Sequence, residues 1–172
     1  MGSTPERHQD ADVQTLPGTN TLTDQMLTSS DVSRIAEISL RQVQWWDERK
    51  LISPHQQGHR RIYLPQDVIE IMVVAELRRK GLSLQKIRRA LRFLRRKLPE
   101  LGSEYLSSSA DLFLLTDGTS IHLKEHAGGI IEILKQARQP MLLVSVSDQV
   151  RRLMSEMVIS RQSGKGKQLK LF

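Results

Sequence analysis

The sequence predicts a mainly α-helical region at residues 28–98 and a small α/β module at residues 111–159, between disordered ends. In the first region, apolar residues recur at helical spacing behind capping residues. In the second, two apolar runs flank the turn dipeptide Asp117-Gly118, and a short helix, an apolar strand and a final helix follow. Hydrophobic residues make up only 38% of the chain. We therefore expect residues 1–27 to be a disordered arm, 99–110 a linker and 160–172 a flexible basic tail.

The first region begins with two short helices. Residues 28–31 (Thr-Ser-Ser-Asp) supply capping side chains for a helix whose apolar residues are Val32, Ile35 and Ala36. A turn at Glu37 and Ile38 follows, and Ser39 caps a second helix that runs to about residue 49. Two short helices joined by a tight turn form a helix-turn-helix, whose second helix normally enters the major groove of DNA.

A hairpin and two further helices complete this region. Pro54 ends the second helix, and residues 55–63 form a hairpin, or wing, with Gly58 at its turn. Pro65 suits the first turn of a third helix, because its missing N–H needs no partner there. Gly81 ends that helix, and Ser83 caps a fourth. The order predicts a winged helix-turn-helix.

The charge favours a polyanionic partner. The chain carries 26 Lys and Arg against 19 Asp and Glu, a net charge of +7. Ten of the basic residues lie between Arg78 and Lys97, where there is no acidic residue. Such a cluster indicates binding to nucleic acid phosphates.

Particular side chains are suited to bases and phosphates. Arg and Gln form bidentate hydrogen bonds with base edges, and Arg pairs with phosphates. We expect the second helix to read bases and the wing and fourth helix to bind the backbone, with one tryptophan in the core and the other beside the DNA. The candidate DNA-binding residues are Arg41, Gln42, Gln44, Trp45, Trp46, Arg49, His59, Arg60, Arg61, Tyr63, Lys86, Arg88 and Arg89.

Five motifs in this region resemble the mercury-resistance-regulator (MerR) family of bacterial transcription factors. They are Ile38-Ser39, Trp45-Trp46-Asp47 with Leu51-Ile52-Ser53-Pro54, Arg61-Ile62-Tyr63, Asp67-Val68, and Lys80-Gly81-Leu82-Ser83-Leu84 with Ile87-Arg88. The resemblance implies a transcriptional regulator that binds palindromic promoters as a homodimer and acts on RNA polymerase. The chain departs from the pattern at Ser33 (usually Ala), Glu37 (usually Gly) and Gln44 (usually Arg).

Two other functions remain open. The last residues, Gln168, Leu169, Lys170, Leu171 and Phe172, resemble the pentapeptide with which bacterial replication and repair proteins bind the sliding clamp, which would make the protein a clamp-tethered accessory. Alternatively, residues 111–159 could bind a small molecule. Because that module is small for an independent core, we expect it to dock on the first region or to self-associate.

Other classes are not indicated. The chain has no cysteine, which excludes disulfides and thiolate metal sites and suits the cytoplasm. His122, Glu125 and His126 are not predicted to share a helix face, so we expect no metal. We find no catalytic set, cofactor motif, signal peptide or membrane span, and expect a cytoplasmic protein that is not an enzyme.

Overall fold

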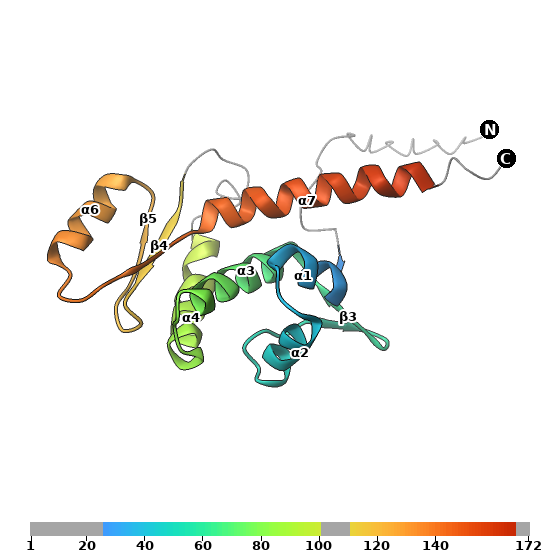
Figure 1. Ribbon diagram of the computed structural model, residues 1–172, viewed down its shortest axis with the longest axis horizontal. Helices are drawn as coiled ribbons and strands as arrows, with labels where there is room; N and C mark the ends of the chain where they lie inside the picture. The colour runs from blue at the N-terminus through green and yellow to red at the C-terminus, as the bar shows by residue number, and fades with distance from the viewer. Residues whose placement is uncertain (1–25, 101–110, 168–172) are drawn as a thin grey trace, which may run out of the picture.

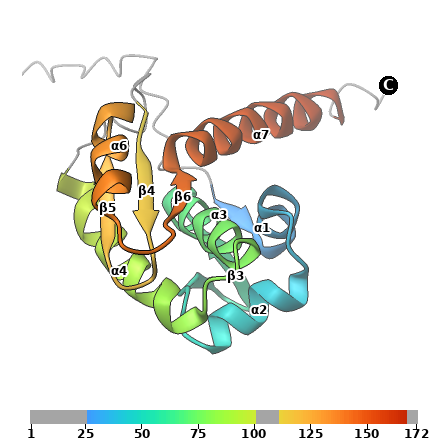
Figure 2. The same cartoon turned by 60° about the vertical axis from the view of Figure 1, so that its left-hand side comes forward.

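Helix α3 (Pro65–Arg79) runs through the middle of the molecule, and helices from both predicted regions pack against it (Figures 1 and 2). The computed structural model describes residues 26–100 and 111–167. Pro65 occupies the first turn of α3, as predicted, and the Asp67 carboxylate accepts a 2.8 Å hydrogen bond from the Leu64 N–H. Buried residues occur all around α3, which is typical of a helix at the centre of a core: Val68, Ile69, Ile71, Met72, Val73, Val74, Ala75 and Leu77.

Helices α1 (Ser29–Ala36) and α2 (Leu40–Glu48) begin at the predicted caps. The Thr28 hydroxyl accepts from the Asp31 N–H, and the Asp31 carboxylate accepts from the Thr28 N–H, which completes a capping box. The Ser39 hydroxyl accepts a 3.1 Å hydrogen bond from the Gln42 N–H. These contacts fix the start of each helix and confirm the predicted pair of short helices.

The turn between α1 and α2 contains a strained residue. Glu37 lies in the left-handed region, with φ 55° and ψ 46°, where side chains other than glycine are uncommon. The Ser33 hydroxyl donates a 2.6 Å hydrogen bond to the Ile38 carbonyl across this turn. Two departures from the MerR pattern, at Ser33 and Glu37, therefore lie at the turn between α1 and α2.

A three-stranded antiparallel sheet lies beside these helices. Its strands are β1 (Leu27–Thr28), β2 (His55–Gln57) and β3 (Arg60–Tyr63), in the order β1-β3-β2. Gly58 turns the β2–β3 hairpin with a φ of 62°, a conformation that glycine adopts without strain. Leu27 is paired with Tyr63 and is buried, so the sheet includes a residue that we had assigned to the disordered arm.

Helix α4 (Leu84–Glu100) follows the turn at Gly81. Its predicted apolar face is buried at Ile87, Leu91 and Leu94. The helix continues two residues beyond the predicted boundary at residue 98. The rest of the predicted linker, residues 101–110, lies outside the described residues.

The second region has the predicted order of hairpin, helix, strand and helix. Its elements are β4 (Phe113–Thr116), β5 (Ile121–Lys124), α6 (Ala127–Gln136), β6 (Leu142–Ser145) and α7 (Val146–Lys167), with an antiparallel sheet ordered β5-β4-β6. We expected the apolar residues of this helix, Ile130, Ile131, Ile133 and Leu134, to face inward, and this expectation is partly wrong. Ile130 is buried, but Ile131 and Leu134 are 52% and 50% exposed, because a helix that covers one side of a sheet buries only one of its faces.

Helix α7 is longer than predicted. It extends to Lys167, whereas we expected a flexible tail from residue 160. We expected the tail because this segment is polar and basic, and it includes Gly164 and Gly166, each of which costs a helix only about 1 kcal/mol relative to alanine. Such a cost does not by itself end a helix.

The two predicted regions share one core. Helix α7 lies across α3 beside α1 (Figure 1). A single cluster of buried residues includes Val43 and Trp46 of α2 together with Val150 and Leu153 of α7. Docking of the second region on the first was one of our two expectations, and it is present within one chain.

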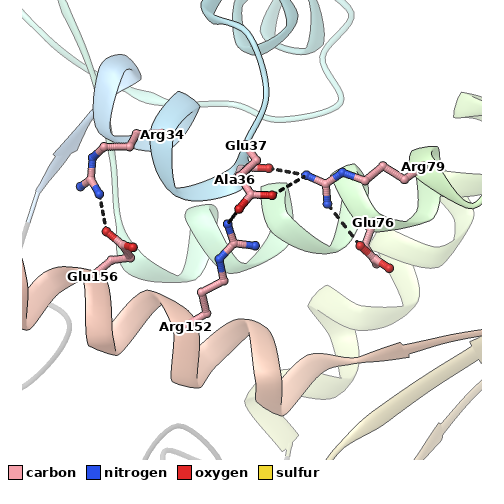
Figure 3. Close-up of polar contacts among 7 residues, drawn as sticks. All are labelled: Arg34, Ala36, Glu37, Glu76, Arg79, Arg152 and Glu156. Carbon is pink, nitrogen blue, oxygen red and sulfur yellow. Dashed lines mark hydrogen bonds and ion pairs between the residues drawn. The ribbon is translucent and has the colours of Figure 1, made fainter.

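Ion pairs accompany this docking (Figure 3). Arg34 of α1 pairs with Glu156 of α7, and Arg152 of α7 pairs with Glu37 at the helix-turn-helix turn. Arg79 of α3 donates a 2.7 Å hydrogen bond to the Ala36 carbonyl and lies 3.9 Å from the Glu37 carboxylate. Exposed ion pairs contribute at most about 1 kcal/mol each. The apolar contact therefore holds α7 in place, and the ion pairs specify where it lies.

Candidate nucleic-acid interface

One face of α2 is exposed and polar. Arg41, Gln44 and Trp45 lie three and four residues apart, so their side chains project from the same side of the helix. Together with Ser39, Gln42 and Glu48, they line an open hollow of about 590 Å³. Trp45 is 38% exposed, and the Arg49 guanidinium lies 5.4 Å from the centre of its indole ring. This face presents hydrogen-bonding groups and one large aromatic surface to the solvent.

Two candidate DNA-binding residues belong to the core. Trp46 and Tyr63 are both 0% exposed. Side chains without accessible surface cannot contact DNA, so the prediction for these two residues is wrong. Because Val43 and Trp46 occupy the buried side of α2, Trp45 must lie on the opposite, exposed side. One tryptophan is therefore in the core and the other at the surface, as we expected for the pair.

Arginines from α4 hold the end of α2. Arg88 donates a hydrogen bond to the Arg49 carbonyl, and Arg95 donates one of 3.3 Å to the Leu51 carbonyl. Carbonyls at a helix C-terminus lack partners within the helix and carry partial negative charge. Arg95 also pairs with Glu70 at 2.6 Å, and this hydrogen bond raises the pKa of Arg95. Arg88, which we expected on a phosphate, is exposed and also contacts the end of α2; its binding to a phosphate stays a prediction.

The β2–β3 hairpin presents two kinds of arginine. Arg60 and His59 are exposed at its tip. Arg61 is oriented towards α2, where its Nε lies 2.7 Å from the Asp47 carboxylate. The neighbouring arginines of β3 therefore have different surroundings: Arg60 is available to a ligand, whereas Arg61 links the hairpin to α2.

Lys86 and Arg89 lie near the second region. The Lys86 side chain passes so close to Gly118, in the β4–β5 turn, that a Cβ at that glycine would overlap it. Arg89 donates a 3.5 Å hydrogen bond to the Gly118 carbonyl. Lys86 and Arg89 thus lie beside the β4–β5 turn, whereas Arg41 and Gln44 line the hollow on α2.

Much of the basic cluster between Arg78 and Lys97 is used within the fold. Arg78 donates to the Leu82 carbonyl, and Arg79 and Lys80 pair with Glu76. The sequence suggested an uncompensated charge because the compensating acids, Glu70 and Glu76, lie outside the window and because it does not show which backbone carbonyls accept from these arginines. Two acids of α2 were not among the predicted site residues: Asp47 pairs with Arg61 of the hairpin, and Glu48 lines the hollow beside Arg41.

Two short helices with an exposed polar second helix, beside a basic hairpin, define a helix-turn-helix DNA-binding domain. The model of the MerR HTH family of regulatory proteins matches residues 27–94. These residues form a MerR-type helix-turn-helix domain, a class that binds double-stranded DNA. The predicted family is therefore confirmed for this part of the chain.

Curated relatives include uncharacterized HTH-type transcriptional regulators of Mycobacterium bovis and Mycobacterium tuberculosis. This chain is 30% identical to each over 125 residues, which cover 70% of this chain and 52% of the relative. The chain thus spans about half the length of these relatives. Because the aligned stretch is longer than residues 27–94, the similarity extends beyond the helix-turn-helix domain.

Other predictions concern features outside this interface. The clamp-binding candidates Gln168, Leu169, Leu171 and Phe172 lie outside the described residues. Among the residues that are described, no group of three or more His, Asp or Glu side chains is arranged to hold a metal ion. Within the same ranges, no helix combines the length and the apolar character needed to cross a membrane.

Proposed function

We propose that this protein is a sequence-specific transcriptional regulator that inserts α2 into the major groove. The observation that carries the proposal is the exposed face of α2, where Arg41, Gln44 and Trp45 line one hollow. Arginine recognises guanine through O6 and N7, and glutamine recognises adenine through N6 and N7. The indole of Trp45 offers apolar contact to a thymine methyl group. Relatives named as transcriptional regulators support this reading.

The β2–β3 hairpin acts as a wing on the DNA backbone. Arg60 and His59 are exposed at the tip and can contact phosphates or the minor groove. Arg61 contributes indirectly, because its contact with Asp47 fixes the hairpin relative to α2. Arg49 is close to the same face through its contact with Trp45, and it supplies a further phosphate contact.

Selection of bound duplexes from a random pool tests the proposal. The wild-type chain is expected to enrich a motif, and a palindrome with fixed half-site spacing would indicate a homodimer. The Arg41→Ala/Gln44→Ala variant is expected to lose preference at particular base pairs. Arg138→Ala, which removes an exposed arginine far along the chain from α2, is the matched control and should retain the motif. Salt-sensitive binding without any enriched motif would contradict sequence-specific regulation.

A second candidate function, sensing of a small molecule, has one supporting observation. A hollow of about 420 Å³ lies between the end of α6 and the β4–β5 hairpin, with Asp117, His122, Ile133 and Met141 among its lining residues. Mixed polar and apolar walls suit a small polar metabolite. Thermal shift against a metabolite panel tests this function, and a shift that His122→Ala abolishes would support it.

A further inference from the structure

Glu48 lies on the DNA-facing side of α2 although it carries a negative charge. It is the last residue of α2, four residues after Gln44 and seven after Arg41, a spacing that keeps all three on one face. Its side chain is exposed and lines the same hollow as Arg41, Gln44 and Trp45. A ligand that contacts those three residues must therefore also meet the Glu48 carboxylate.

The fold does not use this carboxylate. The adjacent acid, Asp47, pairs with Arg61 at 2.7 Å, and Glu70 pairs with Arg95 at 2.6 Å. Two nearby arginines have other contacts, since Arg49 lies over the ring of Trp45 and Arg88 donates a hydrogen bond to a backbone carbonyl. Within the described part of the chain, Glu48 forms no hydrogen bond or ion pair. The Glu48 carboxylate is therefore able to accept a hydrogen bond from a bound ligand.

DNA is an unfavourable partner for a carboxylate unless the contact is a specific one. Phosphates repel the charge, which weakens binding to every sequence. In the major groove, cytosine offers the N4 amino group as a donor. Adenine offers its N6 amino group as well, but the adjacent N7 acceptor repels an anion. An acid on the groove face therefore favours cytosine.

We infer that Glu48 is a specificity-determining residue that accepts a hydrogen bond from the N4 amino group of a cytosine in the major groove. The inference rests on the proposed function, because it requires α2 to lie in that groove. Glu48 contributes discrimination between bases, while the cations beside it contribute affinity.

The test compares motifs selected by the full-length wild type, by Glu48→Gln and by Glu132→Gln. The first substitution replaces the carboxylate by an amide of nearly the same shape, and amides recognise adenine. Cytosine at one position of each half-site should lose at least about fivefold in preference, with adenine gaining, in line with the usual discrimination of a base contact. Glu48→Gln should also bind random duplex more tightly, because a repulsive charge is removed.

Glu132→Gln is the matched control. Glu132 is exposed on α6, so this variant has the same change in net charge away from α2 and should retain the cytosine. A motif that is unchanged in Glu48→Gln would overturn the inference while leaving the proposed function intact. A wild-type chain that selects no motif would overturn both. Thermal melts should be equal for the three proteins, since neither acid has a partner in the described fold.

Discussion

At the scale of single residues, the two arginines of β3 illustrate what a sequence can and cannot indicate. A basic pair on a hairpin beside a recognition helix predicted two phosphate contacts, yet only Arg60 is exposed at the tip. Arg61 is within 2.7 Å of Asp47, a contact that joins residues fourteen positions apart. Alternation along a strand predicts that adjacent side chains point to opposite faces of the sheet. It does not predict which residues each of them contacts.

Arg60→Ala and Arg61→Ala should therefore have different effects on DNA binding. The first should weaken binding to all sequences and lower the salt slope by about one, as expected for loss of one phosphate contact. The second should change affinity mainly for the selected motif, because the hairpin loses its link to α2. Salt titrations of both variants on specific and random duplex measure this difference. An equal loss of salt slope in the two variants would show that Arg61 also contacts a phosphate.

Tyr63 provides a prediction about pH. Its burial raises the pKa of the phenol, and the nearby Asp47 carboxylate acts in the same direction. Because the folded state holds this proton more tightly than the unfolded state, the stabilisation is complete below about pH 10 and is lost as the pH rises through the unfolded and towards the folded pKa. Urea unfolding of the wild type should weaken more steeply above pH 10 than that of Tyr63→Phe. Parallel pH profiles would contradict the assignment.

At the scale of elements, the helices and strands were largely predictable and their surroundings were not. Capping side chains at Thr28 and Ser39, Pro65 at a helix start and Gly58 at a turn act locally, so the sequence reveals them. The partners of the α4 arginines come from the end of α2, from α3 and from the β4–β5 turn, so they depend on tertiary packing. For that reason the basic cluster looked like a DNA-binding face, although part of it serves the helix-turn-helix from within.

The pair of Arg95 and Glu70 should stabilise the fold. Glu70 has a side chain only 13% exposed, and Arg95 supplies its hydrogen bonds. Arg95→Ala leaves this acid without its donor, so the free energy of unfolding should fall by about 1–2 kcal/mol. Arg92→Ala, an exposed arginine of the same helix, should change it by less than about 0.5 kcal/mol. Equal unfolding midpoints for the two variants in urea would exclude the structural role of Arg95.

At the scale of the whole molecule, the sequence suggested two domains where the structure has one continuous core. Composition and the polar stretch after residue 98 favoured a linker, and the small second module raised the question of where it would dock. The second module docks on α3. The apolar residues of α3 occur on all sides of the helix, and residues from both regions bury them. The many apolar residues of α3 indicate that it is a central helix. They do not indicate that α7 packs against it.

Loss of one α7 side chain should therefore destabilise the entire protein. Leu153 is 1% exposed, so Leu153→Ala should lower the free energy of unfolding by about 2–5 kcal/mol. Hydrogen exchange should accelerate in α3 and β4 together. Val158→Ala, at a site 52% exposed on the same helix, is the control and should have little effect. Faster exchange confined to residues 111–167 would show that the two regions unfold independently.

The measurement that tests the central claim most directly is binding to a selected site in which purines are replaced, one at a time, by 7-deazapurines. The substitution removes the N7 acceptor, which only the major groove displays. If α2 reads that groove, affinity should fall about 5- to 100-fold at the contacted purines, and Arg41→Ala should abolish the response at one of them. Full affinity at every substituted position would contradict recognition by α2 in the major groove.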